Sequence, residues 1–122
     1  MKFPINREKL QNIKKDVEEE IIQCNIEEII ENTKVRIIMH AYQGTISHLG
    51  GISNTKLKIE IYPFRIIIPN NLKAYIQLNH YLASLNPWKT HFEIIKETLM
   101  ELFPGVSFET DPLKTYVLID WS

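Results

Sequence analysis

The sequence predicts an α+β fold in two layers, an antiparallel sheet of about four to six strands with helices on one face. Residues 34–62 sort into a polar and an apolar face when they are folded about Gly50-Gly51, a favoured two-residue hairpin turn. A second turn signal, Asp111-Pro112, separates two further alternating segments near the C-terminus. Helical patterns precede and follow the first hairpin. Two hairpins imply antiparallel pairing, and the helices supply the second layer.

Residues 6–32 are predicted to form the N-terminal helix, with Asn6 as its N-cap. Apolar side chains recur at steps of three and four residues: Leu10, Ile13, Val17, Ile21 and Cys24. The stripe drifts after Cys24, and Asn25 with Glu28 resembles a capping box, so a second short helix is an alternative. We expect this helix to lie on the sheet. A subunit contact along part of it is the alternative.

Residues 34–68 are predicted to contain the first hairpin and a third strand. The register about Gly50-Gly51 pairs Leu49 with Ile52 and His48 with Ser53. One face then carries the apolar set, namely Ile38, His40, Tyr42, Ile46, Leu57, Ile59 and Ile61. Residues 64–68 read as the third strand after Pro63. A long open loop over 43–54 is the alternative to paired strands.

Residues 71–103 are predicted to hold two helices. The first, 71–85, turns Leu72, Tyr75, Ile76, Leu82 and Leu85 inward, although 74–78 also fits a strand. The second, 87–103, begins at the Asn86 cap with Pro87 in the first helical position, and Pro104-Gly105 ends it. Its buried stripe comprises Trp88, Phe92, Ile95, Leu99 and Leu102.

Residues 106–121 are predicted to form the C-terminal hairpin. Val106, Phe108 and Thr110 alternate on one arm and return through Asp111-Pro112. Pairing through that turn places Glu109 opposite Lys114 as a favourable cross-strand ion pair.

Length and composition predict one domain over residues 1–122. The chain has 44% hydrophobic residues, enough for a real core, and a net charge of −1, which gives no bulk attraction to nucleic acid or to anionic membrane. The single cysteine excludes an internal disulfide, and we find no signal peptide or membrane span, so a cytoplasmic location is expected. Lysine exceeds arginine and isoleucine exceeds leucine, which indicates an A/T-rich source such as a low-GC bacterium, a phage or another mobile element.

The sequence shows no constellation of residues for catalysis, metal binding or a cofactor. The histidines are His40, His48, His80 and His91, and none of them has the spacing of a zinc site. Ser47 and His48 point to opposite faces of a strand, so they do not form a nucleophile–base pair. Lys56 and Lys58 share their face with Glu60, so nucleic-acid binding is not expected.

The sequence therefore favours a small, cytosolic, non-enzymatic protein that binds a protein partner, as inhibitors, immunity proteins and regulators of mobile elements do. The binding residues would be those at the hairpin tip, His48, Leu49 and Ile52. The two apolar side chains, Leu49 and Ile52, have no core to reach unless something covers them. Packing of these two on the N-terminal helix, or in a self-contact, is the alternative. The alternative is a homo-oligomer that binds or sequesters a small, nucleotide-like ligand where His40 and Tyr42 meet the 71–85 helix. An enzyme using His40, His48 or His91 is the third hypothesis.

Overall fold

The computed structural model describes residues 2–43, 45–46, 52–53 and 55–122 of the chain, without the side chains of 45, 46, 52 and 53. The elements in chain order are α1 (Arg7–Gln11), α2 (Ile13–Gln43), β1 (Thr45–Ile46), β2 (Ile52–Ser53), β3 (Lys56–Glu60), the 3-10 helix η1 (Asn70–Leu72), α3 (His80–Ala83), α4 (Pro87–Thr90), α5 (Phe92–Leu102), β4 (Ser107–Thr110) and β5 (Tyr116–Asp120). This mixture of helix and sheet confirms the predicted α+β class.

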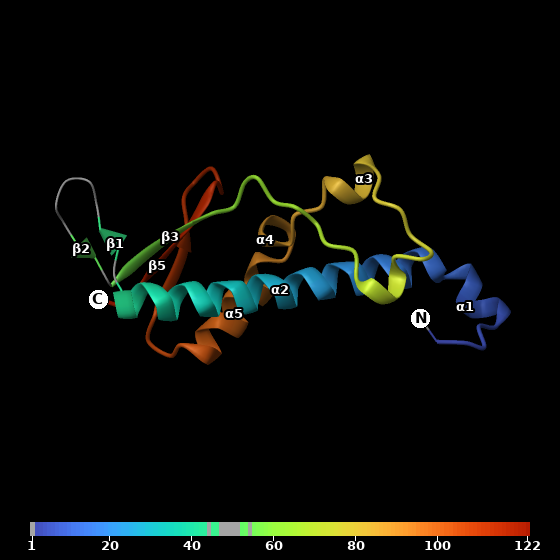
Figure 1. The fold of residues 1–122 in the computed structure, drawn as a ribbon, viewed down its shortest axis with the longest axis horizontal. Coiled ribbons are helices and arrows are strands. Elements are labelled where there is room, and N and C mark those ends of the chain that lie inside the picture. Colours follow the sequence, from blue (N-terminus) through green and yellow to red (C-terminus); the bar gives the residue numbers. More distant parts are fainter. Residues whose placement is uncertain (1, 44, 47–51, 54) are drawn as a thin grey trace.

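Helix α2 runs along most of the length of the molecule (Figure 1). Its 31 residues correspond to about 46 Å of helix. The predicted N-cap at Asn6 is confirmed, since its side chain accepts a hydrogen bond from the backbone N–H of Lys9, 2.8 Å away. The predicted end at residue 32 is wrong, because neither glycine nor proline occurs between Pro4 and Gly44 and each added residue gains a helical hydrogen bond.

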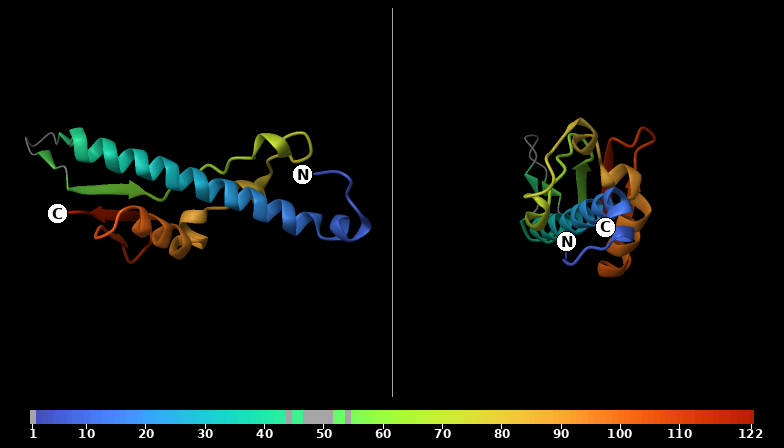
Figure 2. Two further views of the ribbon diagram at one scale, coloured as in Figure 1. Left: turned by 90° about the horizontal axis from the view of Figure 1, so that it is seen from below. Right: turned by 90° about the vertical axis from the view of Figure 1, so that its right-hand side faces the viewer.

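Helix α2 buries different faces in its two halves. Val17 and Ile21 pack in a cluster with Leu72 and Leu82, whereas Ile29 belongs to the cluster that includes the sheet. Figure 2 shows the sheet beside the C-terminal half of the helix and the yellow-green segment beside its N-terminal half. This change of partner explains why the positions of the buried apolar residues drift around the helix along the sequence.

The main sheet has three antiparallel strands in the order β3-β5-β4. The predicted four to six strands are therefore wrong, because β1 and β2 form a separate two-stranded pair. The buried face of the sheet carries Leu57, Ile59, Phe108, Val117 and Ile119, which pack with residues of α2, α4 and α5. Alternate residues of β3 and β5 face outward, which agrees with helices on one face only.

The first hairpin differs from its prediction. Residues 34–43 are the end of α2, so His40 and Tyr42 lie on a helix and pair with no strand. The short β1–β2 pair sets Ile46 opposite Ile52, whereas the predicted register set Ile46 opposite Thr55. The predicted Gly50-Gly51 turn lies outside the described residues. Strand β3 pairs with β5 instead.

The chain from residue 61 to 85 is mostly irregular. The predicted strand at 64–68 is extended but joins no ladder, and the predicted 71–85 helix is wrong except for the short η1 and α3. Leu72 and Leu82 are buried as expected, whereas Tyr75 is exposed. The backbone of Ile67 in this segment is held by Asn25, which lies in the middle of α2 and is 1% exposed, and the Asn25 side chain hydrogen-bonds to both the N–H and the carbonyl oxygen of Ile67. Asn25 is therefore neither a cap nor the start of a second helix.

The predicted 87–103 helix is divided into α4 and α5 at His91. Asn86 caps α4 as predicted, and its side-chain amide also donates to the carbonyl oxygen of Ile61 at 3.2 Å. Trp88, Ile95 and Leu99 are buried as expected, but Leu102 is exposed.

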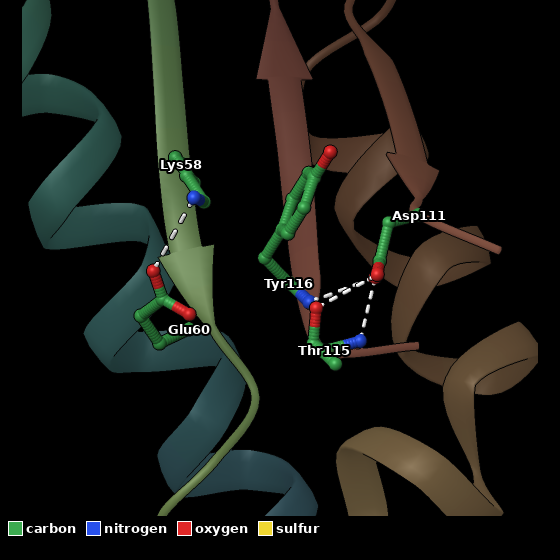
Figure 3. A network of polar contacts seen from close by, with 5 residues as sticks. All are labelled: Lys58, Glu60, Asp111, Thr115 and Tyr116. Carbon is green, nitrogen blue, oxygen red and sulfur yellow. Dashed lines mark hydrogen bonds and ion pairs between the residues drawn. The ribbon is translucent and has the colours of Figure 1, made fainter. Parts of the chain in front are cut away.

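The C-terminal hairpin is confirmed, with a longer turn than predicted. Glu109 lies opposite Leu118 and not opposite Lys114. The Asp111 carboxylate organises this turn by accepting hydrogen bonds from the N–H and hydroxyl of Thr115 and from the N–H of Tyr116 (Figure 3). Partial desolvation acts to raise the pKa of Asp111, but these hydrogen bonds outweigh it and hold the pKa below its usual range.

Candidate functional site

Of the five predicted site residues, the structure describes the side chains of two, His40 and Tyr42. His40 is half-buried near the end of α2, and its ring meets the Trp121 ring edge-on at 5.8 Å between centroids. Tyr42 is 87% exposed and lies about 200° further around the helix. His48 and Leu49 lie outside the described residues, and only the backbone of Ile52 is described. The predicted hairpin-tip site therefore stays a prediction, and so does the predicted ligand site, whose two described residues, His40 and Tyr42, lie on different faces of α2.

The most unusual surface feature is a row of exposed apolar side chains on the C-terminal half of α2, which we call the apolar stripe. Its members are Val35 (52% exposed), Ile38 (59%), Met39 (51%) and Tyr42 (87%). Their spacing of three, one and three residues places them on one face of the helix. Thr33 and Ile37, which are buried, lie on the opposite face. The apolar stripe therefore points away from the core.

The apolar stripe exposes on the order of a few hundred Å² of side-chain surface, the size of the largest apolar patches on typical monomers. Single exposed apolar residues are ordinary, whereas four in one helical row are not. The other face of the helix is held by the core, so the row is rigid before any partner arrives. The glycine-free and proline-free sequence from residue 5 to 43 was the signal that could have revealed it.

The helix is acidic on the N-terminal side of the apolar stripe. Between residues 16 and 33 it carries carboxylates and neither lysine nor arginine; the acids are Asp16, Glu18, Glu19, Glu20, Glu27, Glu28 and Glu31. Burial first, and then Glu27, Glu28 and Glu20, raise the pKa of the Cys24 thiol in this region. Glu31 forms an ion pair with Lys34 at 3.0 Å.

An apolar groove of about 570 Å³ lies between the N-terminal half of α2 and residues 75–82. Its lining includes the buried Val17, Ile21 and Leu82, and two exposed tyrosines, Tyr75 and Tyr81, stand beside them. The Tyr81 hydroxyl lies 3.5 Å from a carboxylate oxygen of Glu18. This volume is in the usual range for small-molecule sites.

A second, more polar groove of about 620 Å³ lies at the start of α5. Lysine and glutamate side chains both line it, so it presents no single sign of charge; the charged residues are Lys89, Glu93, Lys96, Glu109 and Lys114. His91 gives α5 no side-chain cap, and its Nδ1 lies 2.7 Å from the Thr90 hydroxyl.

The outward face of the sheet is polar and internally paired. Lys58 Nζ lies 4.4 Å from the centroid of the Tyr116 ring and 3.6 Å from a carboxylate oxygen of Glu60 (Figure 3). Lys56 lies 3.9 Å from Asp120. These cations are thus engaged with neighbours on their own sheet.

Within the part of the chain that the structure describes, no three His, Cys, Asp or Glu side chains gather closely enough to hold a metal ion. The described helices also include none with the length and apolar character needed to cross a bilayer.

Comparisons of the chain with protein-family models, curated proteins and solved structures gave no match. The candidate surfaces are therefore judged on their geometry, and among them the apolar stripe is the feature that folding alone leaves unexplained.

Proposed function

We propose that this protein acts without catalysis, by binding a protein partner through the apolar stripe on α2. The observation that carries the proposal is the row formed by Val35, Ile38, Met39 and Tyr42, exposed on the side of the helix away from the core. The setting we propose is the cytoplasm, in the role of an inhibitor, immunity protein or regulator, and a phage or another mobile element is the source that the composition favours.

Contact with a partner would remove this row from water, which is the main driving force of most protein association. Apolar residues at i, i+3, i+4 and i+7 are also the anchors by which helices are recognised in grooves and on other helices. Because α2 is already folded and packed, little conformational entropy is lost when it binds.

The test is a double substitution, Ile38→Asp with Met39→Asp, on the exposed face. Both side chains are more than half exposed, so we expect the far-UV circular dichroism and the urea midpoint to stay near wild-type values. Affinity capture from cells that express the protein is then compared between variants. We expect a defined partner to be retained by the wild type and lost by the double variant.

The matched control is Ile94→Asp on α5, since Ile94 is 52% exposed and an acid near a helix N-terminus is well tolerated. This variant should retain the partner. A folded Ile38→Asp/Met39→Asp protein that holds the same partner with unchanged affinity would contradict the proposal. Substitution of Leu49 and Ile52 by Asp tests the hairpin tip in the same assay.

A second candidate function is binding of a small, nucleotide-like ligand by a homo-oligomer, and the apolar groove between α2 and residues 75–82 favours it. Tyr75 and Tyr81 line this groove, and tyrosine rings can stack on a flat ring of a ligand. Native mass spectrometry of protein purified without denaturation tests this candidate. An oligomer with an added small mass that Tyr81→Ala removes would support it, and a bare monomer would count against it.

A further inference from the structure

The apolar stripe continues into acidic residues on the same face of α2. Glu28, Glu31, Val35, Ile38 and Tyr42 follow one another at steps of three, four, three and four residues, the heptad spacing of a helix–helix seam. Two turns of the helix are thus apolar, and the preceding two are acidic. A partner that lies along α2 meets both halves.

The carboxylates in these acidic turns of α2 outnumber the cations that pair with them. Glu31 is paired with Lys34, but Glu28 forms no ion pair within the described residues. Glu27 lies beside it and, among the described residues, accepts a 3.4 Å hydrogen bond from Gln23 but forms no ion pair. A partner that also carried acids here would be repelled, because like charges that face each other suppress binding.

We infer that the occupant of this surface is an amphipathic helix of another protein, apolar at i, i+3, i+4 and i+7 and basic in the adjoining turns. This inference rests on the proposed function and names the chemistry of the partner. Its apolar residues lie on the apolar stripe, and its Lys or Arg side chains reach Glu27, Glu28 and Glu31. An acidic lipid surface fits poorly, since those three carboxylates would face anionic headgroups.

A second copy of this chain fits the surface less well than a basic helix. The antiparallel pairing that covers the whole row sets Val35 opposite Tyr42 and engages only about 10 Å of helix. The row falls short of the roughly 800 Å² per partner of a standard stable interface. Parallel pairing would instead bring Glu28 and Glu31 against the same residues of the other copy.

The test uses two labelled model helices of about 21 residues, long enough to be helical. Both carry leucine at i, i+3, i+4 and i+7; one has lysine and the other glutamate at the flanking positions. Fluorescence anisotropy with the full chain should show about tenfold tighter binding of the lysine peptide at low salt, and the preference should shrink as salt is added.

Two pairs of variants locate the bound peptide. Ile38→Asp with Met39→Asp should weaken the lysine peptide by on the order of tenfold or more. Glu28→Gln with Glu31→Gln should weaken it about fivefold, as expected for two exposed ion pairs. The matched control, Glu97→Gln with Glu101→Gln on α5, removes the same charge from another helix and should leave the affinity unchanged.

Four results would overturn the inference. Equal binding of the two peptides, or equal effects of the two Glu→Gln pairs, would show that the acids do not select the partner. Unchanged binding to the Asp variant would place the peptide elsewhere. Concentration-dependent dimers in sedimentation that Ile38→Asp abolishes would make a second copy the occupant. In all four cases the proposed function is judged separately, by partner capture with the Asp double variant.

Discussion

The side chain of Asn25 offers the sharpest test of how this fold is held together. It is 1% exposed in the middle of α2, and both sides of its amide are used. Its Nδ2 donates to the carbonyl oxygens of Ile21 at 2.7 Å and Ile67 at 2.8 Å, and its Oδ1 accepts from the N–H of Ile67 at 2.8 Å. The perturbation we choose is Asn25→Ala, which removes all three hydrogen bonds without breaking the helix.

The magnitude follows from the groups left behind. A buried polar group without a partner costs about 1–3 kcal/mol, and the Ile67 groups are partly buried, so we take about 1 kcal/mol for each of the two. The lost packing of the side chain adds about 1 kcal/mol. We therefore expect Asn25→Ala to lower the free energy of unfolding by about 3 kcal/mol, a large part of the roughly 5–15 kcal/mol typical of a domain.

The assay is urea unfolding followed by far-UV circular dichroism. With a slope of about 2 kcal/mol per molar urea, the expected loss moves the midpoint down by about 1.5 M. Hydrogen exchange gives a local readout, because the Ile67 amide should be protected in the wild type and exchange faster in the variant. The matched control is Gln23→Ala on the same helix, where an exposed amide is removed and a change within about 0.5 kcal/mol is expected.

An Asn25→Ala protein with wild-type stability and a still-protected Ile67 amide would refute this account of the extended segment. A second variant, Asn25→Asp, keeps the shape but points a carboxylate at two carbonyl oxygens. Burial raises the pKa of such a carboxylate, so we expect this variant to be less stable at neutral pH than at acid pH, where the protonated group donates again. The opposite pH dependence would count equally against the assigned hydrogen bonds.

Three further predictions concern the sheet, its turn and the cysteine. Phe108→Ala should cost about 3–5 kcal/mol in urea unfolding because the ring is buried against α5 and the sheet, whereas Leu118→Ala on the outward face should cost less than about 1 kcal/mol. Asp111→Ala should lower the free energy of unfolding at neutral pH, and the difference between wild type and variant should disappear as the pH falls below about 4. The reason is that a carboxylate with a lowered pKa stabilises the fold above its ordinary pKa, and this stabilisation is lost when the carboxylate is protonated. A difference that stays constant down to acid pH would contradict this. The Cys24 thiol should react with a disulfide reagent more slowly than free cysteine at pH 8, and Glu27→Gln should speed the reaction by lowering its pKa.

The elements predicted well were those whose signals are local. The start of α4 at Asn86-Pro87 and the turn at Asp111-Pro112 are each determined by hydrogen bonds between residues close together in the chain. Both lie where the sequence indicated. The misassigned elements were those whose partner lies far away in the chain. Asn25 looked like a cap because its true partner, Ile67, is 42 residues distant.

The segment 34–43 shows why periodicity misled. It carries the buried Ile37 on one helical face and the apolar stripe on the opposite face, and apolar residues on two faces of a helix can also alternate as in a strand. The candidate site on α2 was missed for the same reason. The row of exposed apolar residues becomes recognisable only once the helix is known, so the sequence led to a protein-binding hypothesis at the hairpin tip, whereas the site we propose lies on α2.

The sequence by itself determined the α+β class, the capped helix starts and the C-terminal hairpin, because hydrogen bonds within a few residues select these structures. Only the tertiary structure decided that the backbone of Ile67 is held by the Asn25 side chain and not by a strand, and that one face of α2 stays open. These outcomes depend on which apolar face finds a partner in the core, and burial of that kind is a property of the whole chain.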